Sequence, residues 1–316
     1  MVLSVSGSVL WPPLRGRDPR DSGALVKARR RGRLALRAYL LHLSHYDPAW
    51  LARKARERPI DLRLAAEVVD ALGAGGFNAL IVDCEDGVRY RTHPELRRPY
   101  SISMAGLARL AARARRRGLD VVPKLNFAQS ARHQHNHWFR PYHDRFDDEE
   151  YWRRAFLVID ELIRACRPRR FFHVGMDEDH DRSTEQFVRA VWRLRDGLRR
   201  RSLRAVMWND SAHLDGRRAV HAEKCLRAEP GLPRDVVQAV WDYSCVHPDI
   251  IRRLRRRGFT VWGAPGRTAA LVQRWRAALL RHGGSGVIMT NWIACRPANR
   301  TRLLEPIETL GRLYGP

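Results

Sequence analysis

Two adjacent carboxylic acids stand at the end of one short apolar run of this sequence. The stretch FFHVGMDEDHD, residues 171–181, places Asp177 and Glu178 directly behind residues that resemble a β-strand. Two neighbouring carboxyls in different environments suit acid–base chemistry, because one can stay protonated and donate while the other stays ionised and stabilises positive charge. We therefore take Asp177 and Glu178 as candidate catalytic residues.

The side chains of this stretch alternate between a polar and an apolar face. The period of two in a strand puts His173, Gly175 and Asp177 on one side. We expect this polar face to point into the active site, with Glu178 turning toward the same ligand where the strand ends. The other face would pack against the rest of the protein.

The residues that follow have a structural explanation. Ser183 stands three residues before Gln186, which is the spacing of a capping box at the start of a helix. Asp179 and Asp181 would lie favourably at the positive end of the same helix. We assign these residues mainly to helix initiation, which leaves the two acids upstream of them for chemistry.

Eight short apolar or β-branched runs alternate with amphipathic stretches over residues 31–316. The runs are 34–43, 77–84, 119–127, 170–176, 203–210, 236–243, 259–265 and 286–293. Most stretches between them repeat apolar residues at three- and four-residue steps, as helices with one buried face do, and only 212–232 looks irregular. Strands that alternate with helices predict a parallel sheet. Eight repeats without a glycine-rich phosphate loop favour a single-domain (β/α)8 TIM barrel.

Neither the start of the chain nor its net charge indicates a membrane or nucleic-acid partner. Residues 1–30 contain prolines without apolar periodicity, and we interpret them as a poorly ordered leader. No basic segment precedes the first short apolar stretch, so we expect a cytoplasmic protein without a membrane segment.

The formal charge is +25, but it comes from dispersed arginines with only four lysines and no recognised nucleic-acid motif. We therefore expect no specific nucleic-acid partner.

Neither the cysteines nor the histidines predict a metal site or a cofactor. The five cysteines lie far apart and never in C-x-x-C spacing, so we read them as buried free thiols. Several histidines cluster in residues 130–144, directly after the third predicted strand. Metal-dependent hydrolase barrels usually carry their H-x-H motif on the first strand, so we assign His135 to a loop that covers the substrate.

A barrel makes a positional prediction, because the carboxyl ends of its strands surround the active site. Here those ends carry acids, amides and tryptophans. Aromatic walls beside hydrogen-bonding groups suit a sugar, which has apolar faces and polar edges. The substrate-binding candidates are His173, Trp208, Asp210, Trp241, Tyr243, Trp262, Trp292, Glu85, Asp86, Asn126 and His135. In the alternative interpretation, the tryptophans only fill the space between sheet and helices.

The run HVGMDE, residues 173–178, resembles the H-x-G-G-D-E signature on the fourth strand of glycoside hydrolase family 20, the β-N-acetylhexosaminidases. The resemblance covers much of residues 32–300 and is that of a divergent, barrel-only relative. Met176 replaces a glycine, where we expect it to add bulk near the sugar. Ala294 stands where the family often has a glutamate.

The family also usually carries an arginine at the end of its first strand, where this chain offers only Arg37 or His42. The resemblance implies substrate-assisted retaining hydrolysis of a terminal β-linked N-acetylhexosamine. Glu178 would protonate the leaving oxygen and later activate water. Asp177 would orient the 2-acetamido group, whose carbonyl oxygen attacks the anomeric carbon, and Tyr243 would steady that oxygen. The sugar walls would be Trp208, Trp241, Trp262 and Trp292.

Two further hypotheses stay open at this point. The protein could be a glycosidase that uses an ordinary second carboxylate, Glu85 or Asp86, on glycosides without an acetamido group. It could also be a carbohydrate-binding barrel without catalysis, which Met176 and the missing glutamate suggest.

Overall fold

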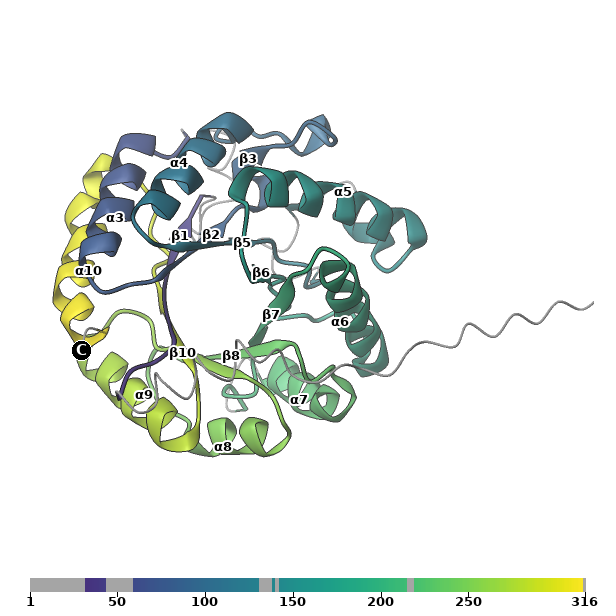
Figure 1. Ribbon diagram of the computed structural model, residues 1–316. Coiled ribbons are helices and arrows are strands. Elements are labelled where there is room, and N and C mark those ends of the chain that lie inside the picture. Colours follow the sequence, from purple (N-terminus) through teal and green to yellow (C-terminus); the bar gives the residue numbers. More distant parts are fainter. Residues whose placement is uncertain (1–31, 44–58, 131–137, 140–141, 215–218, 315–316) are drawn as a thin grey trace, which may run out of the picture.

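Eight parallel strands close into a barrel, which Figure 1 shows end-on. The computed structural model describes residues 32–43, 59–130, 138–139, 142–214 and 219–314. The barrel strands are β1 (Leu36–His42), β2 (Ala79–Asp83), β5 (Asp120–Lys124), β6 (Phe171–His173), β7 (Arg204–Asn209), β8 (Val237–Trp241), β9 (Val261–Ala264) and β10 (Gly286–Thr290). Strand β10 pairs with β1 and closes the ring. The predicted (β/α)8 fold is confirmed, and each predicted run contains one strand. The predicted leader, residues 1–30, lies outside the described residues.

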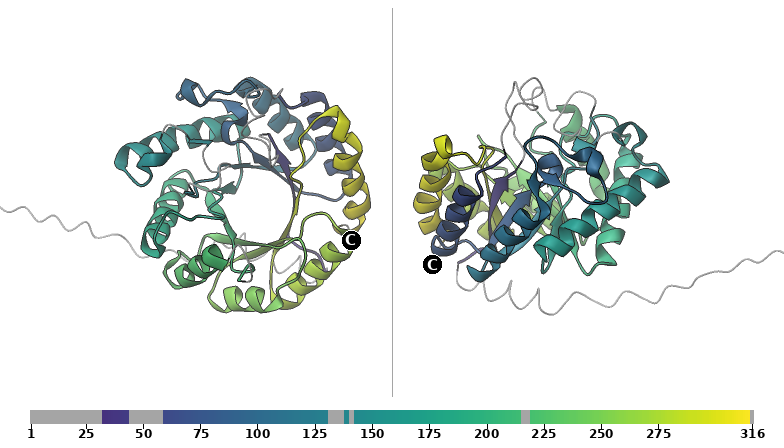
Figure 2. Two further views of the ribbon diagram at one scale, coloured as in Figure 1. Left: turned by 180° about the vertical axis from the view of Figure 1, so that it is seen from behind. Right: turned by 90° about the horizontal axis from the view of Figure 1, so that it is seen from above.

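A ring of helices covers the outer face of the barrel, as the two views in Figure 2 show. Within the described ranges these helices are α3 (Leu62–Ala74), α4 (Met104–Arg116), α5 (Glu149–Cys166), α6 (Thr184–Arg199), α7 (Ala219–Ala228), α8 (Pro248–Arg256), α9 (Ala269–His282) and α10 (Arg300–Tyr314). None of them is long and apolar enough to span a membrane.

Helix α7 lies inside residues 212–232, so the expectation of an irregular segment there was wrong. The helix is short, and its buried face includes the polar residues His221 and Lys224. A buried face of that composition produces no apolar periodicity, which is why the pattern failed to indicate a helix.

The loops between the barrel strands and helices contain several short strands and 3-10 helices. After β2 the chain makes an excursion, residues 85–103, that contains the two-stranded parallel sheet of β3 (Val88–Arg89) and β4 (Ile102–Ser103). The 3-10 helices are η2 (Glu85–Gly87), η3 (Pro94–Leu96), η5 (His143–Arg145), η7 (Glu229–Gly231) and η8 (Pro297–Asn299). The excursion matters for the site because it starts at the carboxyl end of β2.

The predicted capping box at the start of α6 is confirmed. The Ser183 hydroxyl accepts from the Gln186 backbone N–H, and the Gln186 side chain accepts from the Ser183 N–H. Asp179, which was assigned to helix initiation, accepts the backbone N–H of Arg182 at 3.2 Å directly before the helix, and it also has a second role. Its carboxylate is buried and receives Arg182 Nη1 at 2.8 Å and Lys224 Nζ at 3.0 Å. Asp179 therefore ties the loop after β6 to helix α7.

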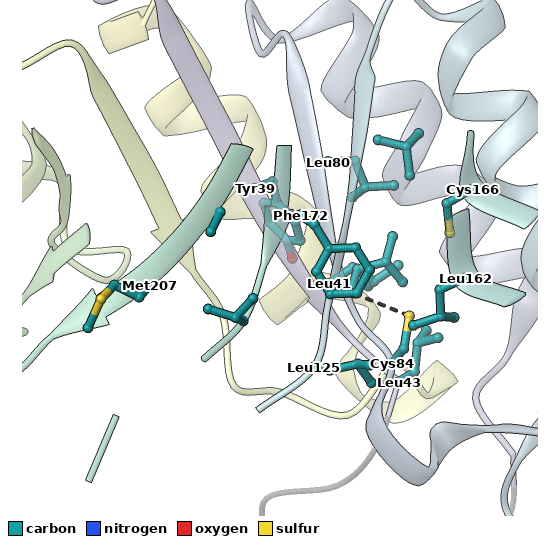
Figure 3. Close-up of a cluster of buried hydrophobic side chains, with 14 of the residues drawn as sticks. Tyr39, Leu41, Leu43, Leu80, Cys84, Leu125, Leu162, Cys166, Phe172 and Met207 are labelled. Atoms are coloured by element: carbon teal, nitrogen blue, oxygen red, sulfur yellow. Dashed lines mark hydrogen bonds between the residues drawn. The ribbon is translucent and has the colours of Figure 1, made fainter. Parts of the chain in front are cut away.

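The apolar core has two layers, one outside the barrel wall and one inside it. Figure 3 shows part of the outer layer, which contains Leu80 and Phe172 of the strands and Leu162 of α5. Cys84 and Cys166 belong to the same layer, and burial raises the pKa of both thiols. The expectation of buried free cysteines holds except for Cys245, which is exposed.

Inside the barrel, small and apolar side chains fill the axis. Trp262 belongs to this inner layer, with its ring centroid 5.0 Å from that of Phe171, the first residue of β6. It also lies against Gly286, the first residue of β10, where a Cβ would come within 2.5 Å of the indole. The prediction that Trp262 lines the mouth of the barrel was therefore wrong, because its indole packs inside the barrel against the first residues of β6 and β10.

The chain turns sharply after β6, which is shorter than the predicted run 170–176. Gly175, Met176 and Glu178 have positive φ angles of 70°, 75° and 54°. A Cβ on Gly175 would lie 2.3 Å from Oδ1 of Asn126, so only glycine fits there. Met176 points into the outer core with 1% of its surface exposed. The expectation that Met176 adds bulk near the sugar was thus wrong.

Gly175→Ala should lower the free energy of unfolding by about 2–5 kcal/mol. The left-handed backbone costs about 1–2 kcal/mol for an L-residue and overpacking against Asn126 adds about 1–3 kcal/mol. Urea denaturation measures the change. The matched control is Gly118→Ala, where φ is +80° but nothing lies within 4 Å of the added Cβ. Equal losses in the two variants would contradict a steric requirement at Gly175.

Candidate active site

Four polar side chains form one layer across the carboxyl ends of four neighbouring strands. They are His42 of β1, Asp83 of β2, Lys124 of β5 and His173 of β6, and each is opposite the next in strand register. The inward-facing residue two positions earlier on each strand belongs to the inner apolar layer. The four side chains therefore point toward the barrel axis, and all of them are buried.

The Lys124 ammonium is the centre of this layer. Its Nζ donates to Oδ1 of Asp83 at 2.7 Å and to Oε1 of Glu85 at 3.2 Å, while Oδ2 of Asp83 lies 2.8 Å from Nδ1 of His42. Burial opposes ionisation of Asp83, but Lys124 and His42 hold the pKa of this carboxyl below its usual range. Burial likewise opposes the charge of Lys124, yet the carboxylates around it raise its pKa above the usual value. Both groups are therefore charged.

Asp177 is held by an amide whose orientation is fixed. Asn126 Nδ2 donates to Oδ1 of Asp177 at 2.8 Å, and Oδ1 of Asn126 accepts the backbone N–H groups of Ala128 and Met176 at 3.0 Å each. Because two backbone donors occupy the amide oxygen, the NH2 group must face Asp177. Burial raises the pKa of Asp177 to about 7; Lys124 opposes this rise and Glu178 adds to it.

Asp210 connects Glu178 to Trp241. Its Oδ2 accepts the backbone N–H of Glu178 and its Oδ1 accepts the indole N–H of Trp241, each at 2.7 Å. Burial, followed by the charge of Asp177, raises the pKa of Asp210 to about 8. The Glu178 residue itself is buried, with 7% of its surface exposed. Both oxygens of Asp210 thus bind protein groups, although the sequence pattern suggested a substrate ligand.

His173 is a neutral hydrogen-bond donor beside Trp208. Its Nδ1 accepts the Gly175 N–H at 3.0 Å, so the ring hydrogen is on Nε2. Burial and the nearby Lys124 charge lower the pKa of His173 well below its usual value. The His173 and Trp208 ring centroids are 4.4 Å apart. Among the described residues, neither His173 Nε2 nor Trp208 Nε1 has a hydrogen-bond partner.

Three of the four predicted tryptophans gather at the carboxyl end of the barrel. Trp208 and Trp292 have ring centroids 6.4 Å apart, and those of Trp241 and Tyr243 are 5.6 Å apart. The Trp292 indole N–H donates to the Tyr243 hydroxyl at 2.7 Å. The ring centroids of His42 and Trp292 are 5.7 Å apart, and the two rings are nearly perpendicular. These rings lie at the ends of β7, β8 and β10, beside the polar layer on β1, β2, β5 and β6, whereas Trp262 lies deeper in the barrel.

The other predicted substrate ligands have different places. Glu85 is ion-paired with Lys124 at 3.2 Å. Asp86 accepts the Tyr100 hydroxyl at 2.6 Å, and its backbone oxygen accepts the Ser101 hydroxyl, so its described hydrogen bonds lie within the excursion. The structure thus does not support Asp86 as a substrate ligand. His135 lies outside the described residues. No group of three possible metal ligands occurs among the residues that are described.

Arg37, considered as a counterpart of the family arginine, lies at the opposite end of β1. Its side chain donates to the backbone oxygens of Gly76 and Leu34. His42 is the β1 residue that reaches the site.

The substrate-binding candidates did not include His42, Asp83 or Lys124, although His42 was considered as a counterpart of the family arginine and the other two stand at the carboxyl ends of predicted strands. A signal for them was present, because each is the last inward-facing residue of its strand and is polar among apolar neighbours. Strand register, which no single run reveals, brings the three together.

Comparison with known proteins adds evidence on the fold. No protein-family profile and no curated protein sequence matches the chain. Solved structures do match. A family 20 β-N-acetylhexosaminidase from Streptomyces coelicolor has a TM-score of 0.64 and 14% identity, over 88% of this chain and 64% of that chain. The chain has the fold of the family 20 catalytic barrel.

Two further solved structures agree. A family 20 exo-β-N-acetylglucosaminidase from Vibrio harveyi, in complex with N-acetylglucosamine, has a TM-score of 0.61 and 12% identity, over 88% of this chain and 54% of that chain. Dispersin B has a TM-score of 0.51 and 14% identity, over 85% of this chain and 96% of that chain. The chain thus spans 64% or less of the first two relatives and nearly all of dispersin B.

Asp177→Asn should raise Tm relative to wild type at about pH 8, and less at about pH 4.5. An unfolded aspartate titrates near about 3.9, whereas the folded-state pKa of Asp177 is about 7. Between these two pH values the folded protein keeps a proton that the unfolded chain has already lost. The wild type therefore loses stability as the pH rises toward 7. Asparagine lacks that cost. Thermal unfolding at the two pH values measures the difference.

The control for this variant is Asp242→Asn, which should act with the opposite sign. Burial opposes the ionisation of Asp242, but hydrogen bonds from His247 and Ser244 lower its pKa to about 2. Its ionised form therefore stabilises the fold above about pH 4, and the variant should lower Tm by similar amounts at pH 4.5 and pH 8. A fall in Tm of similar size for both variants at pH 8 would contradict the assignment for Asp177.

Proposed function

We propose that this protein is a glycoside hydrolase that removes terminal β-linked N-acetylhexosamine by substrate-assisted retaining hydrolysis. The observation that carries the proposal is the pair Asp177 and Glu178, the first held by the Asn126 amide and the second held through its backbone by Asp210. The likeness in fold to family 20 hexosaminidases supports a glycosidase.

In the first step Asp177 acts on the substrate's acetamido group. The Asn126 amide binds Oδ1, so Oδ2 is the oxygen that accepts the acetamido N–H. Only the ionised carboxylate can polarise this group and raise the nucleophilicity of its carbonyl oxygen. That oxygen then attacks the anomeric carbon, and the bond from this carbon to the leaving oxygen breaks.

Glu178 moves the protons in both steps. Its carboxyl proton passes to the leaving oxygen as the glycosidic bond breaks, and the resulting carboxylate later takes a proton from the attacking water. Water adds to the anomeric carbon and restores the acetamido group, so the configuration is retained. Glu178 is mostly buried, which suits a group that must carry a proton near neutral pH.

The Lys124 ammonium partly compensates the negative charge of Asp177. A fixed ammonium near Asp177 favours the ionised form of this carboxyl and limits the rise in pKa that burial causes. The buried N–H groups of His173 and Trp208 offer donors to substrate oxygens. Trp208, Trp241 and Trp292 offer flat apolar surfaces to the sugar ring and the acetamido methyl group.

The alternative second carboxylates are already engaged. Glu85 is ion-paired with Lys124, and Asp86 accepts a hydrogen bond from Tyr100. Neither arrangement supports an ordinary carboxylate nucleophile better than Asp177 supports substrate assistance. The assay below distinguishes these mechanisms, and it also distinguishes catalysis from carbohydrate binding alone.

Glu178→Gln and Asp177→Asn should each lower kcat/KM for a chromogenic N-acetylglucosaminide or N-acetylgalactosaminide by about 10²–10⁴-fold, because each removes a group that acts in the transition state. A thiazoline that mimics the cyclised intermediate should bind the wild type and lose binding in Asp177→Asn. The matched control substrate is the corresponding glucoside or galactoside, which lacks the acetamido group and should not be cleaved.

Other outcomes identify the rival mechanisms. Cleavage of the control glycoside that survives Asp177→Asn would favour an ordinary carboxylate nucleophile. Sugar binding by calorimetry without turnover would favour a binding barrel. Equal rates in the wild type and both variants would rule out the proposed roles.

The pH profile offers an independent test. Because Asp177 acts as a carboxylate and has a pKa of about 7, kcat/KM should rise as the pH increases toward and through 7. Steady-state rates on the chromogenic substrate measure this limb of the profile. A limb below about pH 5 would contradict a raised pKa at Asp177.

A further inference from the structure

We propose that Asp210 is a positioning residue that holds the general acid Glu178 and the aromatic wall Trp241 in one geometry. The inference rests on the proposed function for the role of Glu178. It replaces the expectation that Asp210 binds substrate, because each of its carboxyl oxygens already accepts a hydrogen bond within the protein.

The two hydrogen bonds of Asp210 reach different strands. Asp210 follows the last residue of β7, Glu178 follows β6, and Trp241 is the last residue of β8. Both bonds are 2.7 Å long and buried. One carboxyl group thus joins the carboxyl ends of three neighbouring strands at the height of the candidate catalytic pair.

Glu178 needs such support because of its backbone conformation. Its φ of +54° lies in the left-handed region, which is unfavourable for a residue with a side chain. The N–H that Asp210 accepts belongs to this strained residue, so the hydrogen bond helps to hold the conformation that directs the Glu178 side chain. Without it, the turn can relax and move the carboxyl.

Asp210 is itself well fixed. The backbone N–H of Trp208 donates to the Gly175 oxygen at 2.8 Å, which fastens the end of β7 to the turn after β6. The neighbouring Asn209 side chain binds Gln238 and Ser211 on the other side of the strand. The carboxyl can therefore define the position of Glu178 instead of following it.

The experiment compares two N-acetylglucosaminides that differ in their need for an acid. A 2,4-dinitrophenyl glycoside has a good leaving group and needs little protonation, whereas a methyl glycoside depends on it. Asp210→Ala should lower kcat/KM on the methyl glycoside at least about tenfold more than on the dinitrophenyl glycoside, because misplacing Glu178 removes acid catalysis. Asp210→Asn keeps one acceptor oxygen and should recover part of the activity that Asp210→Ala loses on the methyl glycoside.

The control variant is Asp242→Ala. It removes a carboxylate of similar burial from the end of the next strand, where the described hydrogen bonds join Asp242 to Ser244, Cys245 and His247. A purely structural loss of this kind should lower both rates by the same factor. Equal factors for the two substrates in Asp210→Ala would overturn the inference.

Hydrogen–deuterium exchange separates failure of the inference from failure of the proposed function. Asp210→Ala should speed exchange of the peptide that contains Glu178, and Asp242→Ala should leave that peptide unchanged. If the wild type cleaves neither glycoside, the proposed function fails, and exchange still tests the positioning of Glu178. Unchanged exchange in Asp210→Ala would overturn the positioning role whatever the activity.

Discussion

The arrangement at the mouth of this barrel depends on one buried cation. Lys124 lies between Asp83 and Glu85, and its ammonium compensates two carboxylates that are buried side by side. Buried charges of one sign are strongly unfavourable unless a partner compensates them. Because Lys124 is on the strand next to both β2 and β6, the same charge also acts on Asp177.

This cation creates two kinds of acid within one small region. The carboxyl of Asp83, next to Lys124 and His42, has a lowered pKa and stays ionised. Asp177 and Asp210 are more affected by burial and by neighbouring negative charge, so their pKa values rise to about 7 and about 8. Carboxyls whose environments separate their pKa values are typical of acid–base sites.

Backbone geometry is the second constraint. The turn after β6 uses left-handed conformations at Gly175, Met176 and Glu178, and it accommodates Asn126 only because Gly175 has no Cβ. The turn ends regular pairing early, yet it keeps the alternation of faces. Met176 therefore enters the outer core while Asp177 remains beside the Asn126 amide, and the methionine does not obstruct the site.

Periodicity by itself determined the architecture and part of the site. Eight apolar runs separated by amphipathic stretches predicted the barrel, and the end of the fourth run identified Asp177 and Glu178, because burial on both faces leaves a local pattern in the chain. Helix α7 was not predicted because its buried face carries polar residues. Trp262 was misplaced because a run shows that a strand exists but not the level at which it starts.

The roles of single residues were decided only by tertiary structure. Asp210 looked like a substrate ligand and instead binds Glu178 and Trp241, while Lys124 and Asp83 looked like isolated strand ends and form an ion pair. These contacts join residues about 30 to 40 positions apart, and they depend on strand register and on the direction of each turn. Local sequence encodes which face of a strand is buried, but only the closed barrel determines which side chains meet at its end.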